Sequence, residues 1–315
     1  MKMTYREAFG AAFPEDELRF EPSEGYDEFV PRGSQDFVFN VDLTRDLVMV
    51  LLSGSSDGLF IFGPTGCGKS SHIREVFARL KMPMIGMTCT EATTSADFIG
   101  SWVLVGDDGM RWLDGPLTIA VREGLPLVLD EMDQMRPEEL VILNGILDGS
   151  PLVIPQLGGE VIAIHPRFRL IATGNSNGTW DGSNAYVGVK RQNMAFMDRM
   201  IVARAAYMDP EVERMLLEKA FLGTTITSDI IKKAIELAND IRAQFLAGRI
   251  GMTFSTRSLK RWMRLTIAYH RQDHPLRMAL LKALVNRAEP VDQEVIFRAA
   301  AALFGNAFGS GDTLS

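Results

Sequence analysis

The octet "GPTGCGKS" (63–70) has the spacing G-x-x-x-x-G-K-[ST] of a phosphate-binding loop. It lies between an apolar run and a helical pattern, where glycines let backbone N–H groups wrap phosphate oxygens at a helix N-terminus. We expect Lys69 to contact the β- and γ-phosphates of a nucleotide and the Ser70 hydroxyl to bind Mg²⁺. The predicted nucleotide-contacting residues are Gly63, Pro64, Thr65, Gly66, Cys67, Gly68, Lys69, Ser70 and Ser71.

Two adjacent acids, Asp130 and Glu131, stand at the carboxyl end of the apolar run "LPLVLD" (125–130). Beside a phosphate loop, the first acid can complete the Mg²⁺ shell begun by Ser70. The second can orient and deprotonate an attacking water. A pair that only caps a helix is the competing interpretation, and it is the weaker one behind such a loop. These residues therefore favour cleavage of the nucleotide over phosphoryl transfer to a metabolite.

Two further polar residues occupy informative positions. Asn175 follows the strand pattern "LIATG", and its amide could position the lytic water between the γ-phosphate and Glu131. Taken alone, it would read as a turn asparagine. Arg257 falls in the first turn of a helix that Ser255 is expected to cap. The helix dipole disfavours a cation at that end, so Arg257 is predicted to serve an anion outside the helix. A surface role is the alternative, and Arg261 and Arg264 compete with it.

The elements that would hold these residues follow from hydrophobic periodicity. Strand patterns occupy 58–62, 82–87, 125–130, 168–173 and 201–207, and helical patterns occupy 42–52, 69–81 and 136–149. Segments 101–112 and 151–164 read as hairpins, the first around Gly-Asp-Asp-Gly and the second at Gly158–Gly159. Thr94 and Asp97 have capping-box spacing. Alternating strands and helices predict an α/β fold with a parallel sheet.

After Met208 the strand patterns fade, and 210–304 is almost continuously helical by period. We predict four segments: an acidic N-terminal arm (1–36), an α/β nucleotide-binding domain (37–208), an all-α lid domain (209–304) and a flexible tail (305–315).

Composition bounds the class of protein. The 315 residues are 46% hydrophobic with a formal net charge of −7, which argues against a dedicated nucleic-acid surface but not against a local basic patch. No run of 18 apolar residues exists, so we expect no membrane span. The N-terminus lacks a signal-peptide pattern, and Cys67 and Cys89 have no metal-ligand spacing. A cytoplasmic location is expected.

These elements in this order, followed by a helical domain, resemble the AAA+ ATPases. The chain is similar to their MoxR-related branch, which includes the cobaltochelatase ATPase subunit CobS. The resemblance covers roughly residues 30–290. Its most specific parts are "GPLTIAVREGLPLVLDEMDQMRPEELVILNGILD", "HPRFRLIATGNS", "YVGVKRQNMAFMDRM" and "TFSTRSLKRW". It implies a P-loop NTPase (AAA+) parallel-sheet core with hairpin insertions in helix 2 and before sensor 1, followed by a small all-α lid.

The resemblance also implies roles and partners. Asn175 matches sensor 1, Arg257 matches sensor 2, and Arg199 of "NMAFMDRM" (193–200) matches the segment that presents the arginine finger. We expect Asp198 to orient Arg199, with Arg191 as the next candidate for the finger. Members of the branch form ring hexamers with ATP at the subunit interfaces and commonly work with a partner carrying a von Willebrand A domain. In the chelatase, ATP hydrolysis helps a large subunit insert cobalt into a corrin ring.

The same residues bear on which function is expected. The prediction is a ring ATPase that remodels a partner protein complex, with cobaltochelatase as one case. A small-molecule kinase would need a compact lid and an acceptor site, whereas about a hundred helical residues follow the core. A nucleic-acid-associated P-loop motor remains the alternative, because the hairpins could line a pore. The acidic chain has no basic stripe to favour it.

Overall fold

The computed structural model describes residues 2–19, 25–34, 37–106, 109–178 and 188–309. The described chain divides into two compact units. The first holds the residues up to Pro64 and those between Gly68 and Ala205, and the second holds Thr65–Cys67 and the residues from Ala206 onward.

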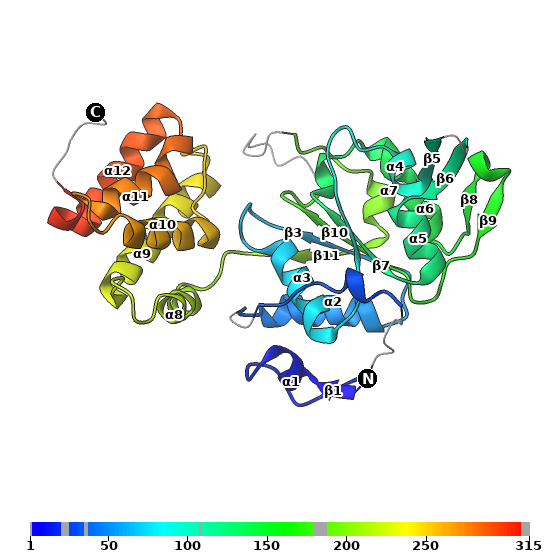
Figure 1. Ribbon diagram of the computed structural model, residues 1–315, viewed down its shortest axis with the longest axis horizontal. Coiled ribbons are helices and arrows are strands. Elements are labelled where there is room, and N and C mark those ends of the chain that lie inside the picture. Colours follow the sequence, from blue (N-terminus) through cyan, green and yellow to red (C-terminus); the bar gives the residue numbers. More distant parts are fainter. Residues whose placement is uncertain (1, 20–24, 35–36, 107–108, 179–187, 310–315) are drawn as a thin grey trace. The chain divides into compact units, whose positions relative to one another are not determined.

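A five-stranded sheet forms the centre of the first unit (Figure 1). Its strands are β3 (Gly58–Phe62), β4 (Ile85–Thr88), β7 (Pro126–Asp130), β10 (Arg169–Gly174) and β11 (Met200–Arg204). They pair in parallel in the order β11-β3-β10-β7-β4. The predicted parallel α/β core is therefore confirmed. The last strand ends at Arg204, three residues before the end of the predicted pattern.

Alternate residues of each strand are buried on opposite faces of the sheet, because successive side chains of a strand point to opposite faces. One apolar cluster contains Phe60, Leu127, Leu129, Leu170 and Ala172 from three adjacent strands. The same cluster includes residues of α5 (Pro116–Glu123) and α6 (Val141–Leu147), so these helices cover that face. The intervening strand residues are also buried. In Figure 1, α2 (Val41–Leu52) and α3 (Lys69–Leu80) lie on the opposite side.

Two antiparallel hairpins extend from this core. Strands β5 (Gly100–Leu104) and β6 (Met110–Asp114) form the first, and β8 (Leu152–Ile154) and β9 (Glu160–Ile162) form the second. Both match the predicted segments, although 107–108 of the first turn lie outside the described residues. The second loop includes a 3₁₀ turn, Pro155–Leu157. Helix α4 (Ser95–Ile99) carries the predicted capping box at Thr94 and Asp97.

Two segments differ from the sequence-based expectation. Residues 136–149 form a 3₁₀ turn, Pro137–Leu140, followed by α6, and not the one continuous helix that was expected. The first unit also contains the 3₁₀ turns Asp27–Phe29 and Met132–Gln134 and the short helix α7 (Met194–Met197). The expected N-terminal arm contains β1 (Lys2–Thr4), α1 (Tyr5–Phe9) and β2 (Glu17–Arg19). Phe9 and Phe13 pack on Phe39 with ring centroids 5.1 and 6.5 Å away. These elements are too short to produce a periodic pattern.

The second unit is helical. It contains α8 (Pro210–Ala220), α9 (Ser228–Leu246), α10 (Thr256–Ala268), α11 (Pro275–Ala283) and α12 (Pro290–Phe304), with 3₁₀ turns at Val285–Arg287 and Gly305–Ala307. Trp262, fully buried, anchors its core and donates from Nε1 to the Leu276 carbonyl at 2.9 Å. The expected tail begins inside this core, because Phe308 is buried. No helix in the described chain is long and apolar enough to span a membrane.

Candidate nucleotide site

The predicted site residues of the first unit converge at one edge of its sheet. The loop at 63–70 follows β3, Asp130 ends β7, and Asn175 follows β10. Since β10 lies between β3 and β7 and all three run parallel, their carboxyl ends meet at the same edge. The open edge beyond parallel strands is where α/β sheets bind ligands.

The phosphate loop leads directly into α3. Gly68, with φ 102°, occupies the N-cap of that helix, where an L-residue would be strained. Lys69 is buried, and its Nζ donates to the carbonyls of Gly63 at 2.7 Å and Pro64 at 3.3 Å. The same Nζ donates to Asn175 Oδ1 at 3.1 Å. The structure thus brings together the predicted cation and the predicted sensor amide, 106 residues apart in sequence.

A pair of oxygen ligands suited to a hard cation lies beside the lysine. Ser70 Oγ donates to Asp130 Oδ1 at 2.6 Å, and the Thr173 hydroxyl donates to the same oxygen. Among the described residues, no cluster of three or more His, Cys, Asp or Glu side chains is arranged to hold a metal ion. Mg²⁺ prefers one or two protein oxygens plus phosphates and water. The donor set at Ser70 and Asp130 therefore fits Mg²⁺ that arrives with a nucleotide.

Glu131, directly after β7, has a left-handed backbone conformation. Its φ of 58° and ψ of 38° are left-handed, which costs a non-glycine residue of order 1–3 kcal/mol and persists only where the surroundings impose it. The Thr173 hydroxyl accepts the Glu131 backbone N–H at 3.1 Å. The Gln134 amide donates to the Glu131 carboxylate. Thr173 therefore contacts both acids, and the sequence analysis did not identify it.

Asp133 is a second residue that the sequence analysis missed. It is fully buried, and its Oδ2 accepts the backbone N–H groups of Asn175 at 2.7 Å and Ser176 at 3.0 Å. A Cβ on Gly174 would lie 2.9 Å from Asp133 Cγ and 2.7 Å from Phe60 Cζ, so only glycine fits there. Asp133 thereby holds the turn that carries Asn175. The third acid in "DEMD" was the available signal.

Burial controls the protonation of two groups beneath the site. It raises the pKa of Asp133, and the hydrogen bonds from Ser176 and Asn175 offset part of this effect. It also raises the pKa of Cys89 to about 12, helped by the charge of Asp130. Cys89 is therefore a neutral thiol at physiological pH and is unsuited to act as a nucleophile.

Arg199 lies just before β11 and forms a bidentate ion pair. Its Nε and Nη2 donate to the two carboxylate oxygens of Asp148 at 2.7 and 2.8 Å, and its Nη1 donates to the Ala195 carbonyl. In the single chain Asp148, which directly follows α6, forms the ion pair with Arg199, and the expectation that Asp198 orients Arg199 toward a neighbouring subunit stays a prediction. The Arg199 side chain stays 30% exposed, and Arg191 is exposed.

Arg257 belongs to the second unit, in the first turn of α10. Ser255 caps this helix as predicted, accepting the Ser258 backbone N–H at 3.2 Å. Arg257 is exposed, and no hydrogen bond or ion pair to another described residue involves its guanidinium. Its proposed role as sensor 2 stays a prediction.

Comparison with known proteins follows the same division of the chain. The family profile "AAA domain (dynein-related subfamily)" matches residues 58–200, and the profile "CbbQ/NirQ/NorQ C-terminal" matches residues 213–303. NtrX from Brucella abortus shares the fold, with a TM-score of 0.50 at 16% identity over 85% of this chain and 62% of that chain.

Three curated relatives resemble parts of the sequence that differ in length. Aerobic cobaltochelatase subunit CobS from Sinorhizobium sp is 29% identical over 82% of this chain and 79% of its own length. Protein CbbQ from Hydrogenophilus thermoluteolus is 32% identical over 60% of this chain and 66% of its own. Protein NorQ from Paracoccus denitrificans is 35% identical over 47% of this chain and half of its own. The two adjoining profiles and these relatives place the chain in the AAA+ ATPase family, in the MoxR-like branch with CobS, CbbQ and NorQ.

Proposed function

We propose that this chain is the Mg²⁺-dependent, ATP-hydrolysing subunit of a ring, most simply a homo-hexamer, that remodels a partner protein complex. The observation that carries the proposal is the convergence of Lys69, Ser70, Asp130 and Asn175 at adjacent strand ends. Nζ of Lys69 lies 3.1 Å from Asn175 Oδ1, and Ser70 Oγ lies 2.6 Å from Asp130 Oδ1. These four polar groups are the ones needed to bind phosphate, hold Mg²⁺ and orient an attacking water.

The nucleotide phosphates would lie along residues 63–71, with backbone N–H groups and Lys69 as donors. Bound Mg²⁺, held by Ser70 and Asp130, would supply charge neutralisation on the β- and γ-phosphates. Lys69 must then exchange the Gly63 and Pro64 carbonyls for phosphate oxygens.

Glu131 accepts a proton from the attacking water as the water oxygen bonds to the γ-phosphorus. The bond to the β–γ bridging oxygen breaks, and ADP and phosphate leave. Asn175 orients that water, and Asp133 holds the Asn175 backbone in place. Catalysis of this kind consists mainly of positioning and charge stabilisation, because the protein forms no covalent bond to the phosphoryl group.

Arg199 acts on the nucleotide of the neighbouring subunit in this proposal, and Arg257 acts from the lid as sensor 2. To reach a neighbour, the Arg199 guanidinium must leave Asp148. Both side chains are substantially exposed, at 30% and 50%, so the pair is weakly held. A fixed cation at the γ-phosphate stabilises charge that develops in the transition state.

Cobaltochelatase is the specific complex that we propose as the target. The support is the extent of the CobS match, 82% of this chain against 60% for CbbQ and 47% for NorQ. A partner with a von Willebrand A domain and a cytoplasmic location accompany this proposal. Stimulation of ATP hydrolysis by such a partner, and not by DNA, would support protein remodelling; stimulation by DNA alone would refute it.

The arginine finger is tested by mixing subunits. Arg199→Ala should bind a fluorescent ATP analogue with unchanged affinity and lose hydrolysis by a factor on the order of 10³. Glu131→Gln should also be inactive. Mixing the two variants should restore activity, because some interfaces then combine an intact Glu131 with a neighbour's intact Arg199. If the mixture stays inactive while wild-type subunits exchange freely, Arg199 is not the finger, and Arg191 is the next residue to replace.

A further inference from the structure

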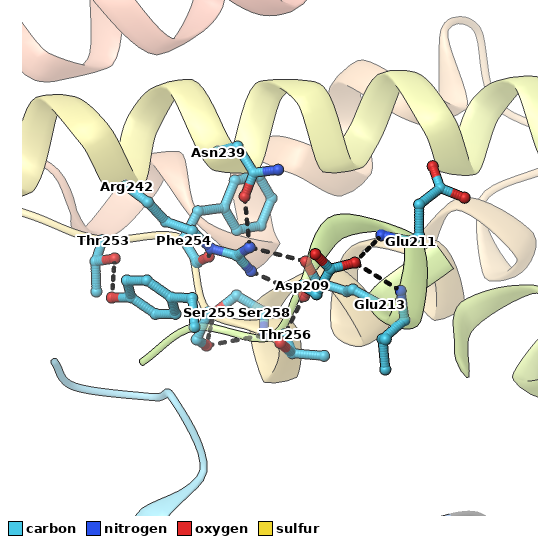
Figure 2. A network of polar contacts seen from close by, with 12 residues as sticks. Asp209, Glu211, Glu213, Asn239, Arg242, Thr253, Phe254, Ser255, Thr256 and Ser258 are labelled. Atoms are coloured by element: carbon cyan, nitrogen blue, oxygen red, sulfur yellow. Dashed lines mark hydrogen bonds and ion pairs between the residues drawn. The ribbon is translucent and has the colours of Figure 1, made fainter. Parts of the chain in front are cut away.

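The second unit contains a fully buried ion pair. Glu213 of α8 and Arg242 of α9 have side-chain exposures of 0% and 3%, and two contacts of 2.8 Å join their carboxylate and guanidinium (Figure 2). Such a pair is weak evidence for net stability, because desolvation of both charges offsets much of their attraction. The unit also has its own apolar core around Trp262. The other contacts of these two side chains therefore point to a role besides stability.

Arg242 also binds the chain just before α10. Its Nε donates to the Phe254 carbonyl at 2.7 Å, and its Nη1 donates to Asn239 Oδ1 at 2.8 Å. The guanidinium carbon stacks 4.7 Å from the centroid of the Tyr207 ring, and the Tyr207 hydroxyl bonds the Thr253 hydroxyl. The planar fork of arginine suits it to hold several partners in fixed directions.

Glu213 holds the first residue of α10. The Thr256 hydroxyl donates to Glu213 Oε1, the oxygen that also accepts from Arg242 Nη2. Figure 2 shows Phe254, Ser255 and Thr256 gathered around the pair. These three consecutive residues immediately precede Arg257. The pair thus binds the helix start at a main-chain carbonyl and at a side-chain hydroxyl.

Arg257 occupies a position where its own helix works against it. A cation in the first turn is repelled by the positive end of the helix dipole, which favours fraying of that turn. A second cation, Arg242, contacts the chain at Phe254 just before this turn, and Glu213 neutralises its charge. A firmly held helix start is what a long, exposed side chain needs to present its charge in one direction.

We propose that the Glu213–Arg242 pair, acting through Thr256 and the Phe254 carbonyl, positions Arg257 for its contact with the nucleotide. The inference rests on the proposed sensor 2 role of Arg257 and adds Glu213, Arg242 and Thr256 as positioning residues. None of the three needs to touch the nucleotide.

The test removes one hydrogen bond and leaves the buried charges paired. Thr256→Val keeps the side-chain shape and deletes only the hydroxyl that binds Glu213. The full-length protein is assayed for ATP hydrolysis, and kcat should fall about threefold to tenfold, the net effect of one typical intramolecular hydrogen bond, with KM for ATP within about twofold. Thr256→Ser, which retains the hydroxyl, should restore kcat.

A matched control exists on the same helix. The buried Thr266 hydroxyl donates to the Trp262 carbonyl at 3.0 Å, away from the helix start. Thr266→Val should leave kcat unchanged. Thermal melting of both variants shows whether loss of stability accounts for any loss of activity.

A double-mutant cycle separates positioning from other effects. Arg257→Ala should lower kcat, and adding Thr256→Val to Arg257→Ala should change kcat by less than about 1.5-fold, because nothing is left to position. An equal loss in both backgrounds would overturn the inference. The inference would also be overturned if Arg257→Ala lowers kcat while Thr256→Val alone has the kcat of the wild-type protein. If Arg257→Ala itself has wild-type kinetics, the proposed role of Arg257 fails first.

Discussion

Asp133 allows the sharpest test of how the nucleotide site is supported. Its Oδ2 is the acceptor for two backbone donors, the partly buried N–H group of Asn175 at 2.7 Å and the buried N–H group of Ser176 at 3.0 Å. Asp133→Ala removes that acceptor. An unsatisfied buried donor costs about 1–3 kcal/mol, so the substitution should destabilise the first unit by about 2–6 kcal/mol.

Asp133→Asn separates the hydrogen bonds from the charge. The amide oxygen can still accept both N–H groups, so part of the loss seen with alanine should be absent. The amide NH2 replaces the buried Oδ1, which has no hydrogen-bond partner among the described residues, so some loss should remain. Burial raises the pKa of Asp133 in the folded protein. Between the unfolded and folded pKa values, the folded state binds more protons, so the Asp133 contribution to stability falls as pH rises through that window. Asparagine cannot ionise, and Asp133→Asn should lack this part of the pH dependence.

Urea unfolding measured at a series of pH values reports both effects. Hydrogen exchange of a peptide spanning residues 170–178 reports the turn directly, and it should exchange faster only in Asp133→Ala. Asp148→Ala is the matched control, since Asp148 is exposed and its loss should barely move the urea midpoint. A cost below about 1 kcal/mol for Asp133→Ala, with unchanged exchange, would refute the reasoning, because a buried and a partly buried donor would then have lost their acceptor at too small a cost.

Two further outcomes follow from packing and charge. Gly174→Ala should lower the free energy of unfolding by about 1–3 kcal/mol, measured by thermal melting, because the new Cβ would lie 2.7 Å from Phe60 Cζ. Gly86→Ala is the control, since the nearest atom there is the flexible Met84 Cε at 3.4 Å. An equal loss of stability in Gly86→Ala would contradict this reason. Asp148→Asn should raise ATP hydrolysis by the assembled protein up to about fivefold, because the carboxylate competes with phosphate for Arg199. A fall in activity would mean that Asp148 instead holds Arg199 in its working position.

Short spacings in the sequence were sufficient to predict the local structure. Lys69 and Ser70 follow a glycine loop within one octet, and the predicted strand and helix flank it as the mechanism requires. The Thr94–Asp97 capping box joins residues three apart. In each case the interacting groups are neighbours in the chain, so the spacing of residue types specifies the geometry.

Contacts between distant segments could not be predicted in this way. Asp198 was the expected partner of Arg199 because it is adjacent, yet Asp148, 51 residues away, forms the ion pair. The contact of Asp133 with Asn175 spans 42 residues. The contact of Arg242 with Glu213 spans 29 residues. No periodicity encodes such pairs, since they depend on which strands and helices become neighbours.

The chemistry of this protein was therefore readable from residue types at fixed spacing: a phosphate loop, a pair of acids after a strand, and an amide after another. The supports of that chemistry were not. Thr173, Asp133 and the Glu213–Arg242 pair are polar side chains whose importance comes from burial and from the backbone groups that they meet. Burial makes each such contact costly to lose, and burial exists only once the sheet and the helices have packed.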